Sequence, residues 1–273
     1  MPFISSSNSY HPIHVGFRFF KYYITALNGK GHGVHSPFVF EFITKVMNDN
    51  RHFYAYNSVE QVRQSVLKNN KVLSITDFGA GSTVTKSNKR KVSDIARSAL
   101  KPKKFSQLMF RIVNYYSANT IVELGTSLGI TTGYLALGNL LGTVYTFEGA
   151  SEVAAIAKDN FSQLALNNID VIEGNFDETL QPQLNKINKI DFAFVDGNHR
   201  KEPTIRYFEQ LLQKSTESSV FIFDDIHWSK GMEEAWEYIK QHSSVTLTID
   251  LFFIGIVFFR KEQKVPQHFV IRF

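Results

Sequence analysis

Residues 121–129 read Ile-Val-Glu-Leu-Gly-Thr-Ser-Leu-Gly, an apolar run followed by an acid and by two glycines, Gly125 and Gly129. Further along, residues 143–149 read Thr-Val-Tyr-Thr-Phe-Glu-Gly and again end in an acid, Glu148. Glycines after a strand let the backbone approach a ligand, and exposed N–H groups at a helix start attract anions. An acid at the tip of the next strand can accept hydrogen bonds from both ribose hydroxyls. Together the two stretches predict a nucleotide-shaped cofactor bound by neighbouring parallel strands.

The glycine spacing narrows the kind of cofactor. A dinucleotide-binding turn has the pattern G-x-G-x-x-G, and its pyrophosphate rests on the helix N-terminus. Residues 125–129 have G-x-x-x-G and lack the glycine that brings the backbone close to a pyrophosphate. The pattern therefore favours a cofactor without a pyrophosphate.

Strand-like and helix-like segments alternate from about residue 120 onward. Runs rich in Val, Ile, Phe, Tyr and Thr predict strands at 120–124, 143–148, 169–173, 190–195, 219–224, 245–252 and 254–260. Helical segments are expected between them, at 130–140, 151–166, 177–186, 201–214 and 230–241. This alternation predicts a parallel sheet with helices on both faces, an α/β sandwich.

The two ends of the chain depart from that alternation. Almost nothing separates the last two predicted strands, so they must form an antiparallel hairpin, because parallel strands need a long crossover. In the first part, helices are expected at 14–28, 36–48 and 58–69, a polar loop at 79–91 and a further helix at 105–117. We expect residues 1–104 to form a mostly helical region that covers the cofactor cleft and residues 105–273 to form the sheet domain.

These motifs, in this order, resemble those of the class I S-adenosylmethionine-dependent methyltransferases. Glu123–Gly129 looks like the first motif of that class, Phe147-Glu148 like its ribose-binding acid, and Glu173–Asp177 like its adenine-side turn. Asp191–Asp196 is similar to the fourth-strand motif, and the final hairpin matches the antiparallel seventh strand. Within the class, the chain is most similar to small-molecule O-methyltransferases related to catechol O-methyltransferase, and the resemblance implies a seven-stranded, mostly parallel sheet.

The resemblance also implies roles for individual residues. The backbone of Gly125–Ser127 would hold the methionine end of S-adenosylmethionine, while Glu123 would orient the loop or bind the ammonium group. Glu148 would take the ribose, and the turn after residue 173 would flank the adenine, with Asp177 a further candidate. The residues implied in cofactor binding are Glu123, Gly125, Thr126, Ser127, Gly129, Glu148, Gly149, Asn175, Phe176 and Asp196.

Catechol-type enzymes carry a metal-binding Asp at the end of the fourth strand, a catalytic Lys three residues later, and Asp-Asn after the fifth strand. Here Asp196 is kept, His199 stands at the position of the lysine, and the fifth strand ends in Asp224-Asp225. The resemblance thus implies a Mg²⁺ site at Asp196, Asp224 and Asp225, with His199 and Asp196 as catalytic residues. Carboxylates suit Mg²⁺, and a metal-bound hydroxyl could lose its proton to histidine at neutral pH. The alternative is that one of the paired aspartates caps the helix from about residue 230 and the other faces solvent.

The composition of the chain indicates the cellular compartment and the partners that we expect. The 273 residues include no cysteine, which excludes disulfides and a cysteine nucleophile and fits a reducing compartment. The N-terminal stretch lacks the features of a signal peptide, and the longest apolar run, residues 251–259, is too short for a membrane-spanning helix. We therefore expect a cytoplasmic protein with no membrane partner, while a homo-oligomer stays open.

Charge is distributed unevenly along the chain. Residues 1–111 carry 17 Lys/Arg against 5 Asp/Glu, whereas residues 112–273 carry 13 against 20. Such asymmetry can mark a nucleic-acid surface, but the basic residues are mostly scattered, which favours a solvated face. Enzymes that methylate a flipped base commonly carry an aromatic motif at the fourth strand, and Asp196-Gly-Asn-His199 is not one. Nucleic acid is therefore a less favoured partner than a small molecule.

Two other motifs have competing interpretations. Residues 75–82, Ile-Thr-Asp-Phe-Gly-Ala-Gly-Ser, also look like a first methyltransferase motif. The polar residues that follow give no apolar helical stripe, so we interpret the segment as a loop near the site. Residues 31–37 hold two histidines three positions apart but no third ligand, so we expect a turn that opens a helix. The sequence thus predicts S-adenosylmethionine-dependent O-methylation of a small hydroxylated molecule; the alternatives are a nucleic-acid methyltransferase and a non-catalytic cofactor- or ligand-binding protein.

Overall fold

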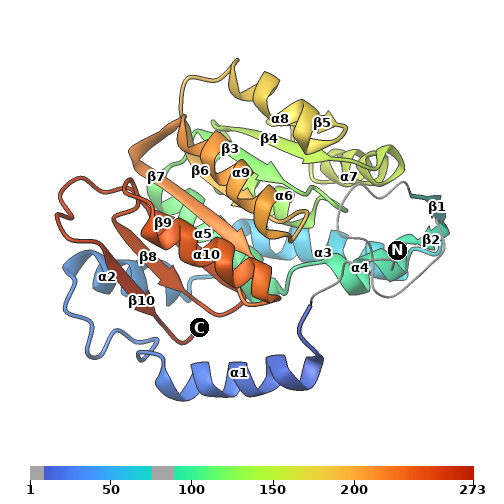
Figure 1. Cartoon of the computed structure of the whole chain (residues 1–273). Coiled ribbons are helices and arrows are strands. Elements are labelled where there is room, and N and C mark those ends of the chain that lie inside the picture. The colour runs from blue at the N-terminus through green and yellow to red at the C-terminus, as the bar shows by residue number, and fades with distance from the viewer. Residues whose placement is uncertain (1–8, 76–88) are drawn as a thin grey trace, which may run out of the picture.

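A computed structural model describes residues 9–75 and 89–273. In these residues a central sheet has eight strands in the order β10-β8-β9-β7-β6-β3-β4-β5 (Figure 1). The strands are β3 (Thr120–Leu124), β4 (Thr143–Glu148), β5 (Ile169–Glu173), β6 (Ile190–Val195), β7 (Ser215–Asp224), β8 (Leu247–Asp250), β9 (Ile254–Phe258) and β10 (Gln267–Val270). Strands β5, β4, β3, β6 and β7 run parallel, and β9 pairs antiparallel with both β7 and β8.

Helices cover both faces of the sheet. They are α1 (Pro12–Thr25), α2 (Pro37–Phe42), the π-helical turn η1 (Ile43–Met47), α3 (Tyr54–Lys68), α4 (Val92–Ala99), α5 (Lys103–Tyr116), α6 (Ile130–Gly138), α7 (Ser151–Gln163), α8 (Phe176–Leu184), α9 (Lys201–Leu212) and α10 (Lys230–Gln241). Elements α2 to α7 share one apolar core with the sheet, and α8 to α10 share the other. Successive residues of a strand enter opposite cores, as Ile121 and Val122 do. The central strands are therefore nearly continuous apolar runs, as expected of parallel strands buried on both faces.

The predicted sheet is confirmed, including its antiparallel hairpin, but it has one strand more than expected. Residues 267–270 form β10, which pairs in parallel with β8 at the edge of the sheet. Its sequence, Gln-His-Phe-Val, gives little strand signal because only alternate residues are partly covered. The fifth predicted strand begins earlier than expected, at Ser215, and its register with β6 is irregular between Ile190 and Phe192.

The N-terminal helices agree only approximately with the expected ranges. The segment predicted as one helix at 36–48 is divided into α2 and η1, and α4 was not predicted. Residues 31–37 do form a turn that opens a helix, because Ser36 caps α2 and Pro37 is its first residue. Lys89–Lys91, expected in a polar loop, form a short strand β2 that pairs antiparallel with β1 (Val72–Ser74). The rest of that loop and nearly all of the glycine motif at 75–82 lie outside the described residues.

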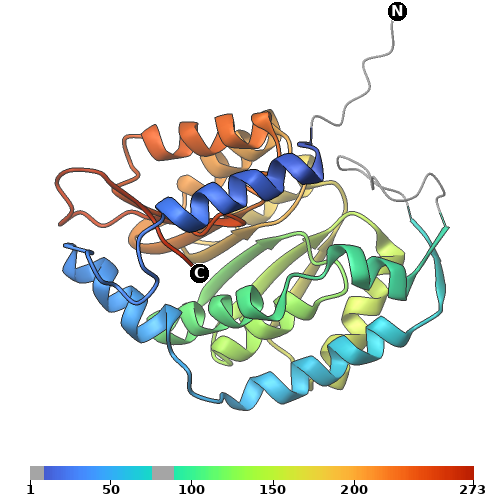
Figure 2. The same cartoon turned by 90° about the horizontal axis from the view of Figure 1, so that it is seen from below.

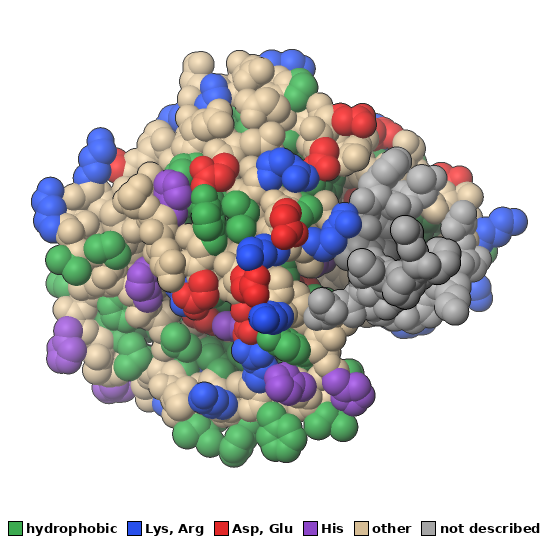
Figure 3. All heavy atoms as spheres, in the orientation of Figure 1, with side chains coloured by type: hydrophobic (Ala, Val, Ile, Leu, Met, Phe, Trp, Pro, Cys, Tyr) green, Lys and Arg blue, Asp and Glu red, His purple; other side chains and the backbone are tan. Residues whose placement is uncertain are grey.

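Helix α1 lies apart from α2–α4, close to α10 and the C-terminal strand (Figure 2). Its inner face contributes Tyr22, which packs with the Phe252 ring, and the next residues continue to a bridge between Leu27 and Ile271. Four large apolar side chains of the opposite face are more than 60% exposed: Ile13, Phe17, Phe20 and Ile24. Hydrophobic side chains accordingly gather along the lower edge of Figure 3. No helix in the described parts of the chain combines the length and apolarity needed to cross a membrane.

Candidate active site

The sheet order brings the acidic strand ends of the sequence motifs to one edge. Strand β6 lies between β3 and β7, so Asp196, directly after β6, stands next to both the glycine loop and Asp224. The N–H of Asp196 donates to the Leu124 carbonyl at 2.8 Å. Acidic, basic and histidine side chains gather near the middle of the face shown in Figure 3. The carboxyl edge of the parallel strands is where open α/β sheets bind ligands.

The loop from Gly125 to Gly129 follows β3 in a conformation that requires glycine at both ends. Gly125 has φ +107, and a Cβ added there would lie 2.1 Å from the Asp196 carbonyl oxygen. Gly129 has φ +75, caps α6, and faces the Phe161 ring so closely that a Cβ would lie 2.5 Å from it. At the start of the turn, the N–H groups of Gly125 and Thr126 both donate to the Phe147 carbonyl at 3.0 Å. The two glycines therefore hold the turn against β4 and β6.

Glu123 is fully buried beneath this loop. Its Oε2 accepts hydrogen bonds from the hydroxyls of Thr132, in α6, and Thr146, in β4, while its Oε1 has no partner among the described residues. The Thr146 hydroxyl also lies 2.6 Å from that of Thr126. Burial raises the pKa of Glu123 to about 8, although the two threonine hydrogen bonds act against the rise. The carboxyl group thus links β3, β4 and α6 from inside the turn.

Glu148 ends β4 and is held by the backbone on both sides. Its Oε2 accepts the N–H of Ser127 at 2.8 Å, and its Oε1 accepts the N–H of Ala150 at 2.9 Å. These two bonds fix the carboxylate at the carboxyl end of β4. Gly149 lies in the bend between β4 and α7. Glu148 is therefore hydrogen-bonded directly to the glycine loop, although the two are about twenty residues apart in sequence.

The turn after β5 supplies an aromatic side chain next to this structure. Asn175 caps α8 by accepting the N–H of Asp177, and Phe176 packs edge-on against Phe147 with ring centroids 6.4 Å apart. A Cβ added at Gly197, after β6, would lie 2.6 Å from the Phe176 ring. Asp177 instead accepts from Arg206 at 2.6 Å and from the Tyr207 hydroxyl at 2.7 Å. The Phe176 ring thus lies next to the residues that follow β6, whereas the Asp177 carboxylate is hydrogen-bonded to α9.

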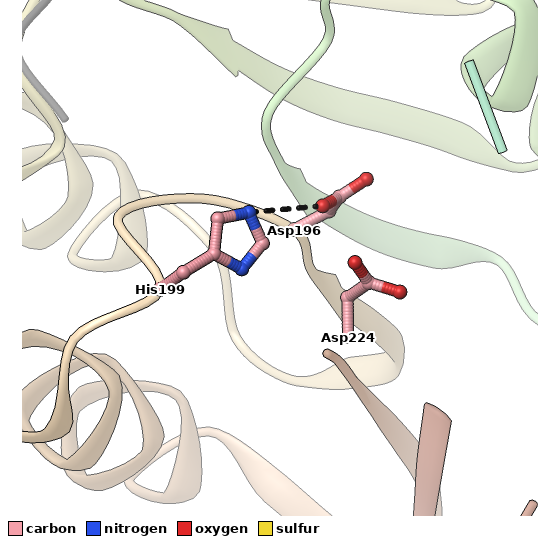
Figure 4. A group of neighbouring side chains, drawn as sticks. All are labelled: Asp196, His199 and Asp224. Carbon is pink, nitrogen blue, oxygen red and sulfur yellow. Dashed lines mark ion pairs between the residues drawn. The ribbon is translucent and has the colours of Figure 1, made fainter. Parts of the chain in front are cut away.

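Asp196, His199 and Asp224 form a compact cluster (Figure 4). One ligand atom from each lies within 4.8 Å of the others, and His199 Nε2 is 3.5 Å from Asp196. Asp225, predicted as the third metal ligand, is not in this group; its carboxylate lies 3.7 Å from His199 Nδ1. Asp225 and His199 both have positive φ, 53° and 35°. The structure therefore brings two of the three predicted ligands together and adds the histidine.

The carboxyl groups of this cluster are strongly shielded from water. Burial raises the pKa of Asp224 to about 7, and the neighbouring Asp196 carboxylate adds to that rise. Burial likewise raises the pKa of Asp225 to about 6, with a further contribution from Asp224, and it raises the pKa of Asp196. Buried carboxyl groups of this kind are stabilised by protonation or by a compensating cation.

Lys101, which no sequence motif marked, supplies such a cation. Its ammonium group forms an ion pair with Asp224 and lies 3.5 Å from Asp196. Burial alone would lower the pKa of Lys101, but the three aspartates outweigh it and raise the pKa. The only sequence signal was a lysine-rich run, Lys101-Pro-Lys-Lys, which is usually solvated. Its connection to the site depends on the fold, because the residue precedes α5 while its partners follow β6 and β7.

With Lys101 in this position the cluster does not fit Mg²⁺. The ion needs carboxylate oxygens at about 2.0–2.1 Å, and the ammonium already lies against the same two carboxylates. Two unit charges about 4 Å apart repel by about 4 kcal/mol at an effective dielectric constant of about 20, and a divalent ion doubles that. A metal could bind only after the lysine had moved away.

The order of the strands, the antiparallel β9 beside β7 and the acids at the ends of β3 and β4 define the class I methyltransferase fold. Residues 122–226 match the model of a family described as a methyltransferase domain. The match begins in β3 and ends just after Asp225, so it includes both acidic strand ends and the aspartate cluster. A search of curated proteins found no match.

Solved structures share this fold. An O-methyltransferase from Bacillus cereus in complex with S-adenosylhomocysteine is 21% identical, with a TM-score of 0.54 over 77% of this chain and 93% of that chain. The O-methyltransferase TomG from Streptomyces achromogenes, in complex with S-adenosylmethionine, is 15% identical, with a TM-score of 0.55 over 77% and 91%. The methyltransferase PaMTH1 from Podospora anserina is 10% identical, with a TM-score of 0.57 over 83% and 97%. At these identities the likeness establishes a common fold.

Proposed function

We propose that this protein is an S-adenosylmethionine-dependent O-methyltransferase that acts on a small hydroxylated molecule. The observation that carries the proposal is Glu148, whose two carboxylate oxygens are held by backbone N–H groups of the glycine loop and of the α7 start. The cofactor bound by the neighbours from Bacillus cereus and Streptomyces achromogenes supports it. Both neighbours are O-methyltransferases, which supports a hydroxylated acceptor.

The described residues fit this cofactor. Backbone N–H groups on both sides hold the Glu148 carboxylate at the end of β4, where ribose hydroxyls would donate to it, and the Phe176 ring offers an apolar contact for adenine. Because neither glycine carries a side chain, the turn from Gly125 to Gly129 packs closely against Asp196 and Phe161, next to Glu148. We assign Glu123 to the support of this turn, since its bonds go to Thr132 and Thr146.

His199 is the residue that we assign as the general base. When bound, S-adenosylmethionine supplies an electrophilic methyl group on a sulfonium. The acceptor hydroxyl gives its proton to an imidazole nitrogen of His199 as its oxygen forms the new bond to the methyl carbon; the methyl–sulfur bond breaks, and neutral S-adenosylhomocysteine leaves. Asp196 and Asp225 lie on either side of the ring, at 3.5 and 3.7 Å, and stabilise the positive charge that it acquires. Transfer otherwise requires mainly alignment of the two substrates.

Turnover of labelled cofactor tests the proposal. The protein is incubated with S-adenosylmethionine labelled in the methyl group and with phenols, catechols and aliphatic alcohols, and transfer to the acceptor oxygen is measured. We expect transfer to at least one class of hydroxylated acceptor. Binding of S-adenosylhomocysteine without transfer to any acceptor would instead favour a non-catalytic binding protein, and transfer to nucleic acid would favour the other alternative.

Substitution of the base is the second test. His199→Ala should lower kcat by about 10²–10⁴-fold at neutral pH, as loss of a general base usually does, and higher pH should restore part of the rate. His32→Ala, at an exposed position in the N-terminal turn, is the matched control. Full activity of His199→Ala at neutral pH would remove His199 from the mechanism.

Three predictions from the sequence accompany this proposal, but the proposed reaction does not depend on them. A cytoplasmic location and a homo-oligomer stay predictions, as does the role of residues 1–104 as a cover over the cleft. Mg²⁺ is left out of the proposed mechanism because Lys101 contacts two of the three predicted metal ligands.

A further inference from the structure

A cationic side chain of the N-terminal region lies against the aspartate cluster at the carboxyl edge. The side chain of Asp224 is 1% exposed, and those of Lys101 and Asp196 are 15% and 16% exposed. Lys101 contacts both carboxylates although it lies on the segment between α4 and α5. This geometry matches that of a bound cation, but the cation is part of the chain.

The segment that carries Lys101 is itself fixed. Arg63 of α3 donates to the Lys101 carbonyl at 2.9 Å, and the same guanidinium donates to Glu60 at 3.0 Å. Pro102 follows, and its carbonyl accepts the N–H of Phe105 at 2.9 Å to open α5. Because the backbone is held from both sides, the lysine side chain is directed to the same place in each molecule.

We infer that Lys101 is the resident cation of this site and that methyl transfer proceeds without a divalent metal ion. An ammonium group has three donors, and two carboxylates can take two of them. The third can bind an acceptor oxygen while it loses its proton to His199, so the charge would stabilise the developing oxyanion. This catalytic part rests on the proposed function; the claim about the cation does not.

Metal binding tests the inference directly. Lys101→Met keeps the length of the side chain and removes its charge, so the three aspartates should gain affinity for a divalent ion. We expect Mn²⁺ binding, followed by electron paramagnetic resonance of the free ion, to increase at least tenfold over wild type. Asp224→Asn added to Lys101→Met should abolish the gain. Lys103→Met, two residues away on α5, is the matched control and should resemble wild type.

Two further variants keep the test informative if Lys101→Met folds poorly. Lys101→Arg retains the charge and should gain no Mn²⁺ affinity. Lys101→Met should show a rise in Tm on addition of Mn²⁺, and the double variant with Asp224→Asn should be more stable than Lys101→Met without metal. These readouts need no turnover, so they separate failure of this inference from failure of the proposed methyltransferase reaction.

Activity gives the last readout. Wild-type turnover, once an acceptor is found, should be unchanged by EDTA and by added Mg²⁺, and Lys101→Met should have a lower kcat. The inference would be overturned if the wild-type protein bound one Mn²⁺ per chain and if Asp224→Asn abolished that binding. It would also be overturned by a Lys101→Met protein as stable as wild type that gains no metal affinity.

Discussion

Glu123 belongs to the same sequence motif as the glycine loop, but its side chain binds other residues of the protein. The sequence predicted either a contact to the cofactor or support of the loop. In the structure its carboxyl group is fully buried and bonds to Thr132 and Thr146, two residues that no sequence pattern marked. Threonine in a strand and in a first helical turn is ordinary, so only the fold reveals their part.

The buried carboxyl group leads to a prediction about stability and pH. The pKa of Glu123 is about 8 in the folded protein against an ordinary value of 4.5, because burial disfavours its charged form. Between these values the folded state holds a proton that the unfolded chain has lost, so stability falls as pH rises. Glu123→Gln cannot titrate, and its stability relative to wild type should rise by up to about 1.4 kcal/mol per pH unit across that range. Urea denaturation of both proteins from pH 5 to 8 measures this, and a constant difference would contradict it.

Lys101 marks the limit of prediction at the residue scale. Its charge, its neighbours Lys103 and Lys104 and its position near a proline are typical of a solvated turn. The contact to Asp224 spans 123 positions in sequence, and a long flexible side chain carries no periodic signal. Asp177 illustrates the opposite case, because its motif suggested the adenine edge while Arg206 and Tyr207 hold it elsewhere.

At the scale of elements, the turn between β3 and α6 was the most predictable part of the molecule. Its glycines are needed for a physical reason, since Gly125 has positive φ and lies against the Asp196 carbonyl. Strands β3 to β7 were predictable because strands buried on both faces must be apolar throughout. The edge strand β10 lacks that constraint, and its alternating, half-exposed residues were missed.

Gly125→Ala should therefore damage this turn. The added Cβ would lie 2.1 Å from a backbone oxygen, so we expect a loss of roughly 3 kcal/mol or more of stability and of cofactor binding. Gly16→Ala is the control: a Cβ there meets nothing within 4 Å, and helix α1 should gain about 0.5–1 kcal/mol. Thermal melts with and without S-adenosylhomocysteine distinguish the two. A Gly125→Ala protein with wild-type Tm and binding would contradict the assigned geometry.

At the scale of the whole molecule, α1 is tied to the sheet domain by charged and aromatic contacts. Glu233 of α10 accepts from the Tyr10 hydroxyl, forms an ion pair with Arg18 and lies 3.0 Å from His227 Nδ1. The other ring nitrogen of His227 is 2.7 Å from Asp250. No pattern in the sequence joins residues this far apart, so the N-terminal helix could be predicted but its position could not.

Glu233→Gln should loosen α1 without disturbing the core. Removing the charge weakens the bonds to Arg18 and His227, and charge-assisted bonds contribute about 1.5–3 kcal/mol each. Hydrogen exchange of the α1 amides should become about tenfold faster or more, while exchange in β3 and β4 stays unchanged. Glu234→Gln, at the next residue on α10, affects only pairs with Lys201 and Lys230, which do not involve α1, and serves as control. Equal exchange in the two variants would show that the contact does not hold α1.

Cofactor binding through Glu148 is the most direct test of the whole account, and calorimetric titration with S-adenosylhomocysteine measures it. Wild-type protein should bind one molecule per chain, and Glu148→Gln should bind about 10- to 100-fold more weakly, since a charged acceptor for two hydroxyls is lost. Glu178→Gln, at an exposed position of α8, should bind like wild type. No binding to the wild-type protein, or equal affinity in Glu148→Gln, would contradict the account.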